Sequence, residues 1–410
     1  MARQRPALAY YQRMASPSGQ VSGDVRRHNL ALVLEYLIRT GPSSRSEIAA
    51  GAGLARGSVT ALVQVLTEAG WLRESYTVGG SKGRPRTRLE IACEGHALLA
   101  VQIASDSASA LATTVAGEDL VRVNVGHTGG DPAAVLNVTS SLVTQVLRRL
   151  RASGRRVVDA TVVVLAPVGG SPARVLADVT LGWPDTDVVV QLRRRVPALR
   201  AVDLRLLSDT PVAAGAELRR LGGVDNAIYL KGDSNIGGAL VMDGTAVHGA
   251  HGFAGSLGHI AVVPDGELCV CGQHGCLITV AGVPALLRAA QVGRGLDLLS
   301  PSAALDELVR RIEAGDPAAT AAWDQALPWI GRALQILSMA TDPQTIVIGG
   351  HWARLTPSIA AAFLADRPTI AGGADFHVDV VAGALGDEAA LRGAVEAARD
   401  RIVKNPLALR

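Results

Sequence analysis

Three of the chain's four cysteines lie close together and follow a histidine: His259 precedes Cys269, Cys271 and Cys276. Three thiolates and one imidazole complete a tetrahedral shell for zinc, and a shell without an open position is typical of a structural site. A disulfide is not expected, because a single residue separates Cys269 from Cys271 and any pairing leaves one thiol over. The alternative is three unconnected buried thiols, with His259 bonded to the backbone.

The length and composition describe a globular protein. A chain of 410 residues with 48% hydrophobic and 19% charged residues is expected to form two or three domains. No apolar run reaches the roughly 18 residues of a membrane span, and the N-terminus has no apolar segment of a signal peptide. We therefore expect a cytoplasmic protein, in a reducing compartment that favours metal binding over disulfides.

The charge is distributed unevenly along the chain. Residues 1–95 contain 13 Lys and Arg against 7 Asp and Glu, a net charge of +6, whereas the remaining residues sum to −3. A basic N-terminal part on a mildly acidic body is typical of a nucleic-acid-binding module joined to a second domain. Residues 1–23 contain arginines, no acid and no hydrophobic periodicity, which predicts a disordered basic tail.

Residues 24–95 have the pattern of a winged helix-turn-helix domain. Apolar residues from Leu30 to Ile38 recur at helical spacing, and Gly41-Pro42 ends that helix. Ser44, followed by Glu47, predicts a capping box that opens a short second helix. A tight turn and a third helix over residues 56–69 complete the motif, whose last helix lies in the major groove of DNA.

The predicted DNA contacts come from the third helix and from a basic wing. The outward side chains of the helix are short or hydrogen-bonding, which suits a helix seated deep in the groove. Residues 71–76 and 87–91 read as two strands around a Gly/Pro-rich basic tip, which suits a minor groove or flanking phosphates. The contacts expected are Arg56, Ser58, Thr60, Gln64, Lys82, Arg84 and Arg86. The alternative is a three-helix bundle with a solvated basic loop.

The stretch GFAGSLGHI, followed by CVCGQHGCL, resembles the zinc signature of the ROK family, named for repressors, open reading frames and sugar kinases. Ser256 and Ile278 stand where that family has glutamates. The resemblance implies a two-lobed α/β domain of the actin and hexokinase type over residues 96–410, with a zinc loop at 259–276. Strand-like runs that alternate with helical patterns through this region agree with two α/β lobes. A winged helix-turn-helix ahead of this body is the layout of ROK repressors.

The glycine-rich phosphate loops that the resemblance implies for a kinase are altered. The first corresponds to residues 102–108, which contain no glycine, and the second to residues 232–238, which include Asp233. Side chains and added acids oppose the close approach of a phosphate to backbone amides. Asp209 corresponds to the catalytic base of the family kinases. We therefore expect no ATP binding and no enzymatic activity; an ATP-dependent sugar kinase is the alternative.

The sugar-binding positions that the resemblance implies are partly replaced. They fall at Ser208, Asp209, Ser256, His259 and Ile278, and only the aspartate and the histidine match the family. A carboxylate can accept two hydrogen bonds from sugar hydroxyls, whereas a serine provides such bonds poorly and an isoleucine provides none. Either the effector is therefore different or the pocket is vestigial. An alternative interpretation of Asp209, with equal support, is the N-cap of a helix. Trp183 is interpreted either as a stacking face for a sugar ring or as a core residue.

Together these patterns predict a DNA-binding transcriptional repressor of carbohydrate metabolism genes, with structural Zn²⁺ as its cofactor. The expected partners are a double-stranded DNA operator and a sugar or sugar-derived effector bound near Ser208, Asp209, Ser256 and His259. A two-fold operator predicts a homodimer or a homotetramer. A third interpretation is a regulator that responds to a protein partner and binds no small molecule.

Overall fold

The computed structural model describes residues 22–77, 86–176, 181–291, 299–365 and 377–408. The chain divides into two compact units: Met1–Cys93 with Asp400–Arg410, and Glu94–Arg399. The boundary after Cys93 lies two residues before the expected one. The residues from Asp400 onward, which the sequence interpretation assigned to the second domain, belong to the first unit. The predicted tail over residues 1–23 lies almost wholly outside the described residues.

The first unit contains the expected three helices, α1 (Ser22–Thr40), α2 (Arg45–Gly51) and α3 (Arg56–Glu68). The capping box is confirmed, because the Ser44 hydroxyl accepts from the Glu47 amide while the Glu47 carboxylate accepts from the Ser44 amide at 2.7 Å. These bonds fix the start of α2 after the turn at Gly41. The buried face of α3 consists of Val59, Leu62, Val63 and Leu66.

Two antiparallel strands complete the helix-turn-helix unit, β1 (Leu72–Thr77) and β2 (Arg86–Ile91). Their register runs from Leu72 opposite Ile91 to Thr77 opposite Arg86, so the wing predicted from the sequence is present. The tip between the strands, with Lys82 and Arg84, lies outside the described residues.

The C-terminal segment packs in this first unit. Trp71, at the start of the wing, is only 1% exposed, and its indole nitrogen donates to the carbonyl oxygen of Pro406 at 2.7 Å. The short 3-10 helix that contains this proline spans Pro406–Ala408. A buried indole N–H needs an acceptor, and the far end of the chain supplies it. The assignment of residues 400–410 to the first unit follows from such contacts.

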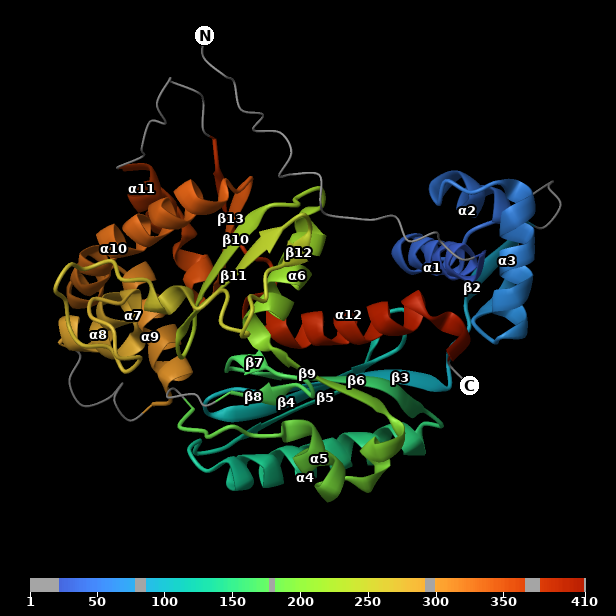
Figure 1. The fold of residues 1–410 in the computed structure, drawn as a ribbon, viewed down its shortest axis with the longest axis horizontal. Helices are drawn as coiled ribbons and strands as arrows, with labels where there is room; N and C mark the ends of the chain where they lie inside the picture. Colours follow the sequence, from blue (N-terminus) through green and yellow to red (C-terminus); the bar gives the residue numbers. More distant parts are fainter. Residues whose placement is uncertain (1–21, 78–85, 177–180, 292–298, 366–376, 409–410) are drawn as a thin grey trace, which may run out of the picture. The chain divides into compact units, whose positions relative to one another are not determined.

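The second unit contains two five-stranded sheets with the same pattern of neighbours (Figure 1). In each sheet the central strand pairs antiparallel with the next strand along the chain and parallel with a later one. The first sheet, in the order β5-β4-β3-β6-β9, comprises β3 (His96–Ile103), β4 (Ser107–Thr113), β5 (Asp119–Gly126), β6 (Arg156–Val164) and β9 (Asp203–Ser208). The second sheet, in the order β12-β11-β10-β13-β14, comprises β10 (Ala227–Gly232), β11 (Ile236–Met242), β12 (Thr245–Ala246), β13 (Thr345–Gly350) and β14 (Asp379–Ala382).

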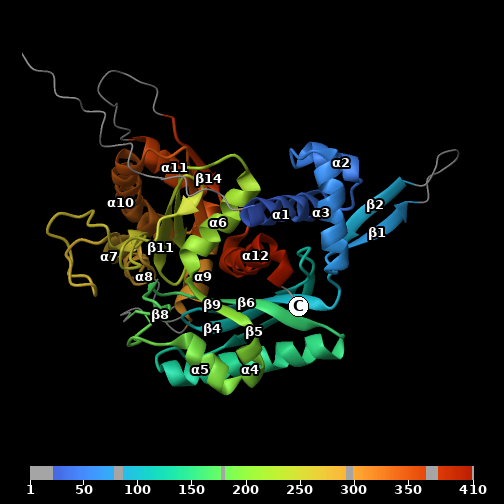
Figure 2. The same cartoon turned by 45° about the vertical axis from the view of Figure 1, so that its right-hand side comes forward.

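The first lobe is built on the first sheet. Helices α4 (Pro132–Ala152) and α5 (Val188–Arg195) cover one of its faces, as Figures 1 and 2 show. Asp131 caps α4 by accepting from the amides of Ala133 and Ala134, and Pro132 supplies a pre-set first turn. A small two-stranded sheet, β7 (Val168–Gly169) and β8 (Arg174–Val175), follows the first sheet's strand β6.

The second lobe packs helices against the second sheet. Its apolar core includes Ile228 and Leu230 of β10 and Trp323 of the longest helix. Its helices are α7 (Leu277–Ala281), α8 (Val283–Ala289), α9 (Pro301–Glu313), α10 (Pro317–Thr341) and α11 (Thr356–Ala365). A last helix, α12 (Ala389–Lys404), follows β14.

One helix contacts the strands of both lobes. Helix α6 (Asp209–Leu221) begins directly after β9 of the first sheet and also contacts β11 and β12 of the second. Its first turn therefore lies where the two lobes meet, which is where the polar residues singled out in the sequence are found. Within the described ranges no single helix is long and apolar enough to span a membrane; the bent pair α2–α3 meets the length and composition test only when combined.

Candidate functional site

The structure brings His259 and the three clustered cysteines together. One ligand atom from each of the four lies within 4.8 Å of the others. Sγ of Cys269 is 3.5 Å from Nδ1 of His259, and Sγ of Cys271 is 3.6 Å from Sγ of Cys276. Zinc bonds of about 2.3 Å to sulfur and about 2.0–2.1 Å to nitrogen give tetrahedral edges of roughly 3.8 Å for S···S and 3.6 Å for S···N. The spacing thus fits a tetrahedral metal site, and all three thiols are free.

A tight backbone turn sets this spacing. The amide of Cys269 donates to the carbonyl of Gln273 at 2.7 Å, and the amide of Gly275 donates to Glu267 at 2.9 Å. Gly275 has φ of +72°, and a Cβ added there would lie 1.8 Å from the carbonyl oxygen of Val263. Only glycine fits this position, because both the backbone conformation and the neighbouring carbonyl exclude a side chain.

Without a metal ion, the close approach of the three thiols is energetically unfavourable for their ionised forms. Burial, and after it the neighbouring thiols of Cys271 and Cys269, raise the pKa of Cys276 to about 12. Burial also opposes ionisation of Cys271, but hydrogen bonds from the Gln273 amide and the neighbouring thiols leave its pKa lowered. Sulfurs held this closely gain most from a shared cation, since metal binding is what stabilises several adjacent thiolates.

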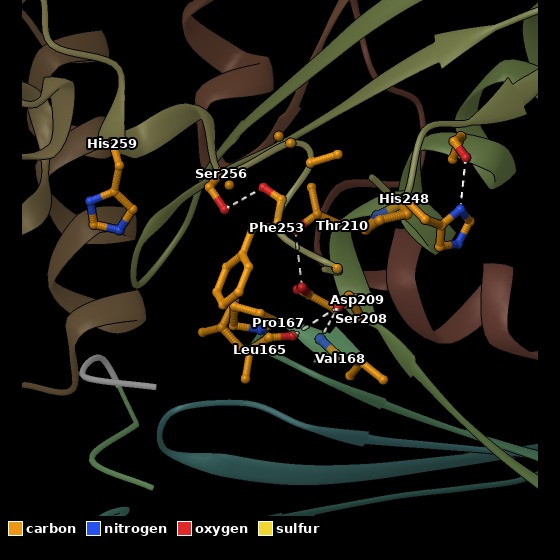
Figure 3. Close-up of a pocket in the computed structure, with 18 of the residues that line it drawn as sticks. Leu165, Pro167, Val168, Ser208, Asp209, Thr210, His248, Phe253, Ser256 and His259 are labelled. Atoms are coloured by element: carbon orange, nitrogen blue, oxygen red, sulfur yellow. Dashed lines mark hydrogen bonds between the residues drawn. The ribbon is translucent and has the colours of Figure 1, made fainter. Parts of the chain in front are cut away.

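A cavity of about 700 Å³ lies between the two lobes of the second unit, and Figure 3 shows part of its lining. The volume is within the range of small-molecule sites. All four residues that the sequence interpretation assigned to ligand binding line this cavity: Ser208, Asp209, Ser256 and His259. Ile278, the fifth carried-over position, packs against the apolar core of the second lobe.

The two serines of this set are already engaged by the backbone. Ser208 donates to the carbonyl of Ala166 at 2.9 Å and accepts from the amide of Val168 at 3.1 Å. Ser256 donates to the carbonyl of Phe253 at 2.9 Å. The single proton of each hydroxyl is therefore directed away from a ligand, which leaves only acceptor capacity.

Asp209 forms a buried ion pair. Its Oδ2 accepts from Nζ of Lys231 at 2.6 Å, and the two side chains are 5% and 6% exposed. The same ammonium contacts Asp233 at 3.1 Å. Burial alone would lower the pKa of Lys231, but the carboxylates of Asp209 and Asp233 raise it above its ordinary value. The lysine is therefore a permanent cation against the aspartate.

The segments that correspond to the phosphate loops carry side chains where a kinase has exposed backbone amides. Residues 104–107 form a tight turn between β3 and β4, closed by the Ala104 amide and the Ser107 carbonyl at 2.9 Å. After β10, the Asp233 carboxylate lies 3.7 Å from Nε2 of His351 as well as against Lys231. A carboxylate fixed at this place repels a phosphate group.

The third helix of the first unit presents the predicted face to solvent. Arg56, Ser58, Thr60 and Gln64 are all exposed on α3, opposite its apolar face. The Gln64 amide donates to Glu68 at 2.9 Å, and Thr60 bonds back to the carbonyl of Arg56. Arg86 is the first residue of β2. The exposed face carries short or hydrogen-bonding side chains, as the sequence interpretation expected for this helix.

Known families match both units in this order. The ROK family profile matches residues 98–401, which is most of the chain, and the IclR helix-turn-helix domain profile matches residues 29–75. The chain belongs to the ROK family. Its fold is the two-lobed actin and hexokinase-like domain of that family, preceded by a helix-turn-helix domain.

Three similar proteins illustrate the range of similarity. The DNA-binding transcriptional repressor Mlc of Escherichia coli is 23% identical over 333 residues, covering 79% of this chain and 81% of Mlc. A solved ROK family transcriptional regulator, described as a homologue of the E. coli Mlc protein, superposes with a TM-score of 0.74 at 23% identity, covering 94% of this chain and 98% of that one. The glucokinase of Halalkalibacterium halodurans is 30% identical over 233 residues, covering 52% of this chain and 68% of the enzyme.

The match to the solved regulator covers 94% of this chain and therefore extends into the N-terminal unit, whereas the match to the glucokinase covers 52%. The helix-turn-helix profile matches residues 29–75 of that unit. The chain is thus a DNA-binding transcriptional regulator of the ROK family.

The structure decides two alternatives that the sequence left open. The N-cap of α6 is Ser208, without a side-chain cap bond, so the N-cap interpretation of Asp209 is wrong; the carboxylate turns to Lys231 instead. Trp183 is 3% exposed in the core of the first lobe, which excludes it as a stacking face. The sequence interpretation missed Lys231 and Phe253. One signal for Lys231 was available, since the chain has only three lysines.

Proposed function

We propose that this ROK protein is a sequence-specific repressor of carbohydrate metabolism genes. Helix α3 enters the major groove of an operator, where Arg56, Ser58, Thr60 and Gln64 contact bases and phosphates. The basic wing with Lys82, Arg84 and Arg86 contacts the flanking backbone. The single observation that carries this proposal is the exposed polar face of α3 on a capped helix-turn-helix.

The cavity of the ROK body is the proposed site of control. Residues from both lobes line it, so a ligand that binds there favours one arrangement of the lobes over another. We infer that this difference changes the operator affinity of a homodimer or homotetramer, because a two-fold operator needs two helix-turn-helix units at a fixed spacing. Asp209, with Ser208, Ser256 and His259 around it, forms the polar part of this site.

The four clustered side chains are proposed to hold a structural zinc ion. His259, Cys269, Cys271 and Cys276 supply four ligands, and the distances between their atoms match the edges of a zinc tetrahedron. The ion would stabilise the loop that joins the cavity lining to α7, since both His259 and Cys271 also line the cavity. With four protein ligands no position remains for a reacting water.

Phosphoryl transfer is not part of this proposal. A catalytic aspartate must accept a proton from the sugar hydroxyl, but Oδ2 of Asp209 already accepts a hydrogen bond from Nζ of Lys231 at 2.6 Å, and that lysine keeps its positive charge. The acidic side chain of Asp233 further opposes ATP. The second candidate, an ATP-dependent sugar kinase, is favoured only by the retained Asp209; formation of a sugar phosphate from ATP by the purified protein would establish it.

The experiment that tests the main proposal is selection of binding sites from random duplex DNA with the full chain. We expect enrichment of a two-fold symmetric sequence, whose binding weakens steeply as salt increases because arginines displace counterions from phosphates. Failure to enrich any sequence, with the protein folded, would refute the DNA-binding assignment of α3. Size measurement of the complex then distinguishes a dimer from a tetramer.

A further inference from the structure

The polar side chains that line the cavity are largely satisfied within the protein. Ser208 and Ser256 direct their hydroxyl protons to backbone carbonyls, and Thr210 donates to Oδ1 of Asp209 at 3.0 Å. The other carboxylate oxygen, Oδ2, accepts from Lys231. An unsubstituted hexose carries hydroxyls around its whole ring and needs a partner for each one that it buries. Other polar side chains of the lining are also partly engaged, since Asn235 accepts from the Ile236 amide and Nδ1 of His248 lies 2.8 Å from the carbonyl oxygen of Ala246. The lining therefore offers few further partners for sugar hydroxyls.

The charge of the lining excludes an anionic ligand. In the described part of the chain, Asp209 is the only Asp, Glu, Lys or Arg among the residues that line the cavity. Its charge is balanced by Lys231, which is buried and contributes no lining atom of its own. A phosphate or carboxylate group would therefore enter without a lysine or arginine to bind it, at a large desolvation cost.

The part of the wall around Phe253 is apolar and already formed. Phe253 is 51% exposed, which is unusual for a phenylalanine, and its ring lies next to Leu165 and Pro167 in Figure 3. The loop that carries Phe253 is packed tightly against β7, because a Cβ on Gly252 would lie 2.3 Å from the carbonyl oxygen of Val168. An exposed aromatic ring on a fixed loop loses little freedom when a ligand covers it, so its burial favours binding.

We propose that this cavity binds a neutral glycoside with an aryl or alkyl group, in place of a free hexose or a sugar phosphate. The few hydroxyls that the site accommodates lie toward Asp209, and the apolar group covers Phe253. This inference rests on the proposed control of the protein by a small molecule. It identifies the chemical class of that molecule by what the lining can and cannot bind.

Calorimetric titration of the full chain with three matched probes tests the ligand class. The probes are phenyl β-D-glucoside, glucose, which lacks the apolar group, and glucose 6-phosphate, which adds charge. We expect the phenyl glucoside to bind about tenfold or more tighter than glucose, and glucose 6-phosphate to give no binding. Equal or tighter binding of glucose, binding of the phosphate, or no binding of the phenyl glucoside would overturn the proposal.

Two variants locate the binding. Phe253→Ala should weaken phenyl glucoside binding about tenfold, and it should fold normally because the ring is half exposed. Val190→Ala, at an exposed apolar residue on α5 outside the cavity, is the matched control and should bind like the unaltered chain. Ser256→Glu adds a carboxylate to the lining and should therefore reduce the ratio of the affinity for the phenyl glucoside to the affinity for glucose. Unchanged affinity in Phe253→Ala contradicts the assigned site.

The two proposals fail separately in these experiments. Operator selection without any ligand tests DNA binding, and the titrations without DNA test the ligand class. A chain that enriches an operator but does not bind the phenyl glucoside retains the proposed repressor function and loses this inference. A chain that binds the phenyl glucoside through Phe253 but enriches no DNA retains the inference about the cavity and loses the repressor function.

Discussion

Nζ of Lys231 lies 2.6 Å from Oδ2 of Asp209, in an ion pair whose side chains are both almost completely buried. The lysine comes from β10 of the second sheet, and the aspartate begins α6 directly after the first sheet. The pair therefore joins the two lobes at the floor of the cavity. The same carboxylate is the one that a ROK kinase would use as its base. The ion pair that stabilises the ROK body therefore also accounts for its proposed loss of catalysis.

Replacement of Lys231 by Met should lower the free energy of unfolding by about 3–5 kcal/mol, because Asp209 is left as an uncompensated buried charge. Adding Asp209→Asn to that variant should recover part of the loss. Urea denaturation of the two single variants and the double variant measures the coupling energy. Lys404→Met, at an exposed lysine on α12, should stay within about 0.5 kcal/mol of the unaltered chain. Additive effects of the two core substitutions would contradict the ion pair.

The pH dependence of this ion pair has a definite sign. Because the pKa of Lys231 is raised in the folded state, its stabilisation is fully present below the ordinary lysine value of 10.5 and is lost as the pH rises through the folded value. The stability difference between the unaltered chain and Lys231→Met should therefore be constant between about pH 6 and 9. A difference that decreases within this range would show that another group titrates against the pair.

Loss of one thiol should abolish metal binding. Cys271→Ser is expected to reduce zinc from about one ion per chain to almost none, and to lower the midpoint of thermal unfolding. Cys93→Ala, at a cysteine far from the cluster in the sequence, should retain the metal. Elemental analysis after dialysis measures both. Full retention of zinc by Cys271→Ser, with unchanged stability, would refute the four-ligand site.

The turn of the cysteine loop can be tested without removing a ligand. Gly275→Ala should release zinc, because the added methyl group meets the carbonyl of Val263. Gly272→Ala has a similar backbone strain, with φ of +91°, but meets no atom within 4 Å. It should therefore retain more metal than Gly275→Ala. Equal retention would indicate that the close contact does not set the sulfur spacing.

The wing and the third helix should affect DNA binding differently. Arg84→Ala with Arg86→Ala is expected to weaken binding to all sequences and to reduce the salt slope by about 2, one for each lost phosphate contact. Gln64→Ala should relax sequence preference by about 1–3 kcal/mol at one position and leave the salt slope unchanged. Arg194→Ala, an exposed arginine on α5, is the control for charge alone. Unchanged affinity and slope in the double variant would exclude the wing from the interface.

The bond between Trp71 and Pro406 predicts a local effect on the first unit. Trp71→Phe leaves the Pro406 carbonyl without its buried donor and should destabilise this unit by about 1–3 kcal/mol. Trp323→Phe removes a comparable bond to Ser358 in the second unit and serves as the matched control. Limited proteolysis, followed at sites in each unit, distinguishes the two effects. Destabilisation of the second unit by Trp71→Phe would contradict the expected local role.

Much of the architecture follows from local patterns in the sequence. The capping box at Ser44 and the apolar spacing from Leu30 to Ile38 in α1 were each sufficient, because short-range periodicity and backbone bonding determine such elements. The cysteine and histidine spacing also identified a candidate metal site before any geometry was available. The charge bias of residues 1–95 separated the two functional parts.

Other features depended on partners far apart in the chain. Asp209 has the sequence context of a helix cap, and only folding brings Lys231 from another sheet against it. Phe253 has the pattern of an ordinary loop residue until its ring is found exposed in the cavity. Local propensity does not encode such pairings, since they arise when distant elements pack.

The sequence by itself determined the helices and wing of the first unit, the order of the two main domains and the identity of the clustered histidine and cysteines. Only the tertiary structure decided which hydrogen bonds of the cavity are already used, and that the last residues complete the first unit through Trp71 and Pro406. The physical reason is that a buried polar group must be paired, but the partner it finds depends on how remote segments meet in space.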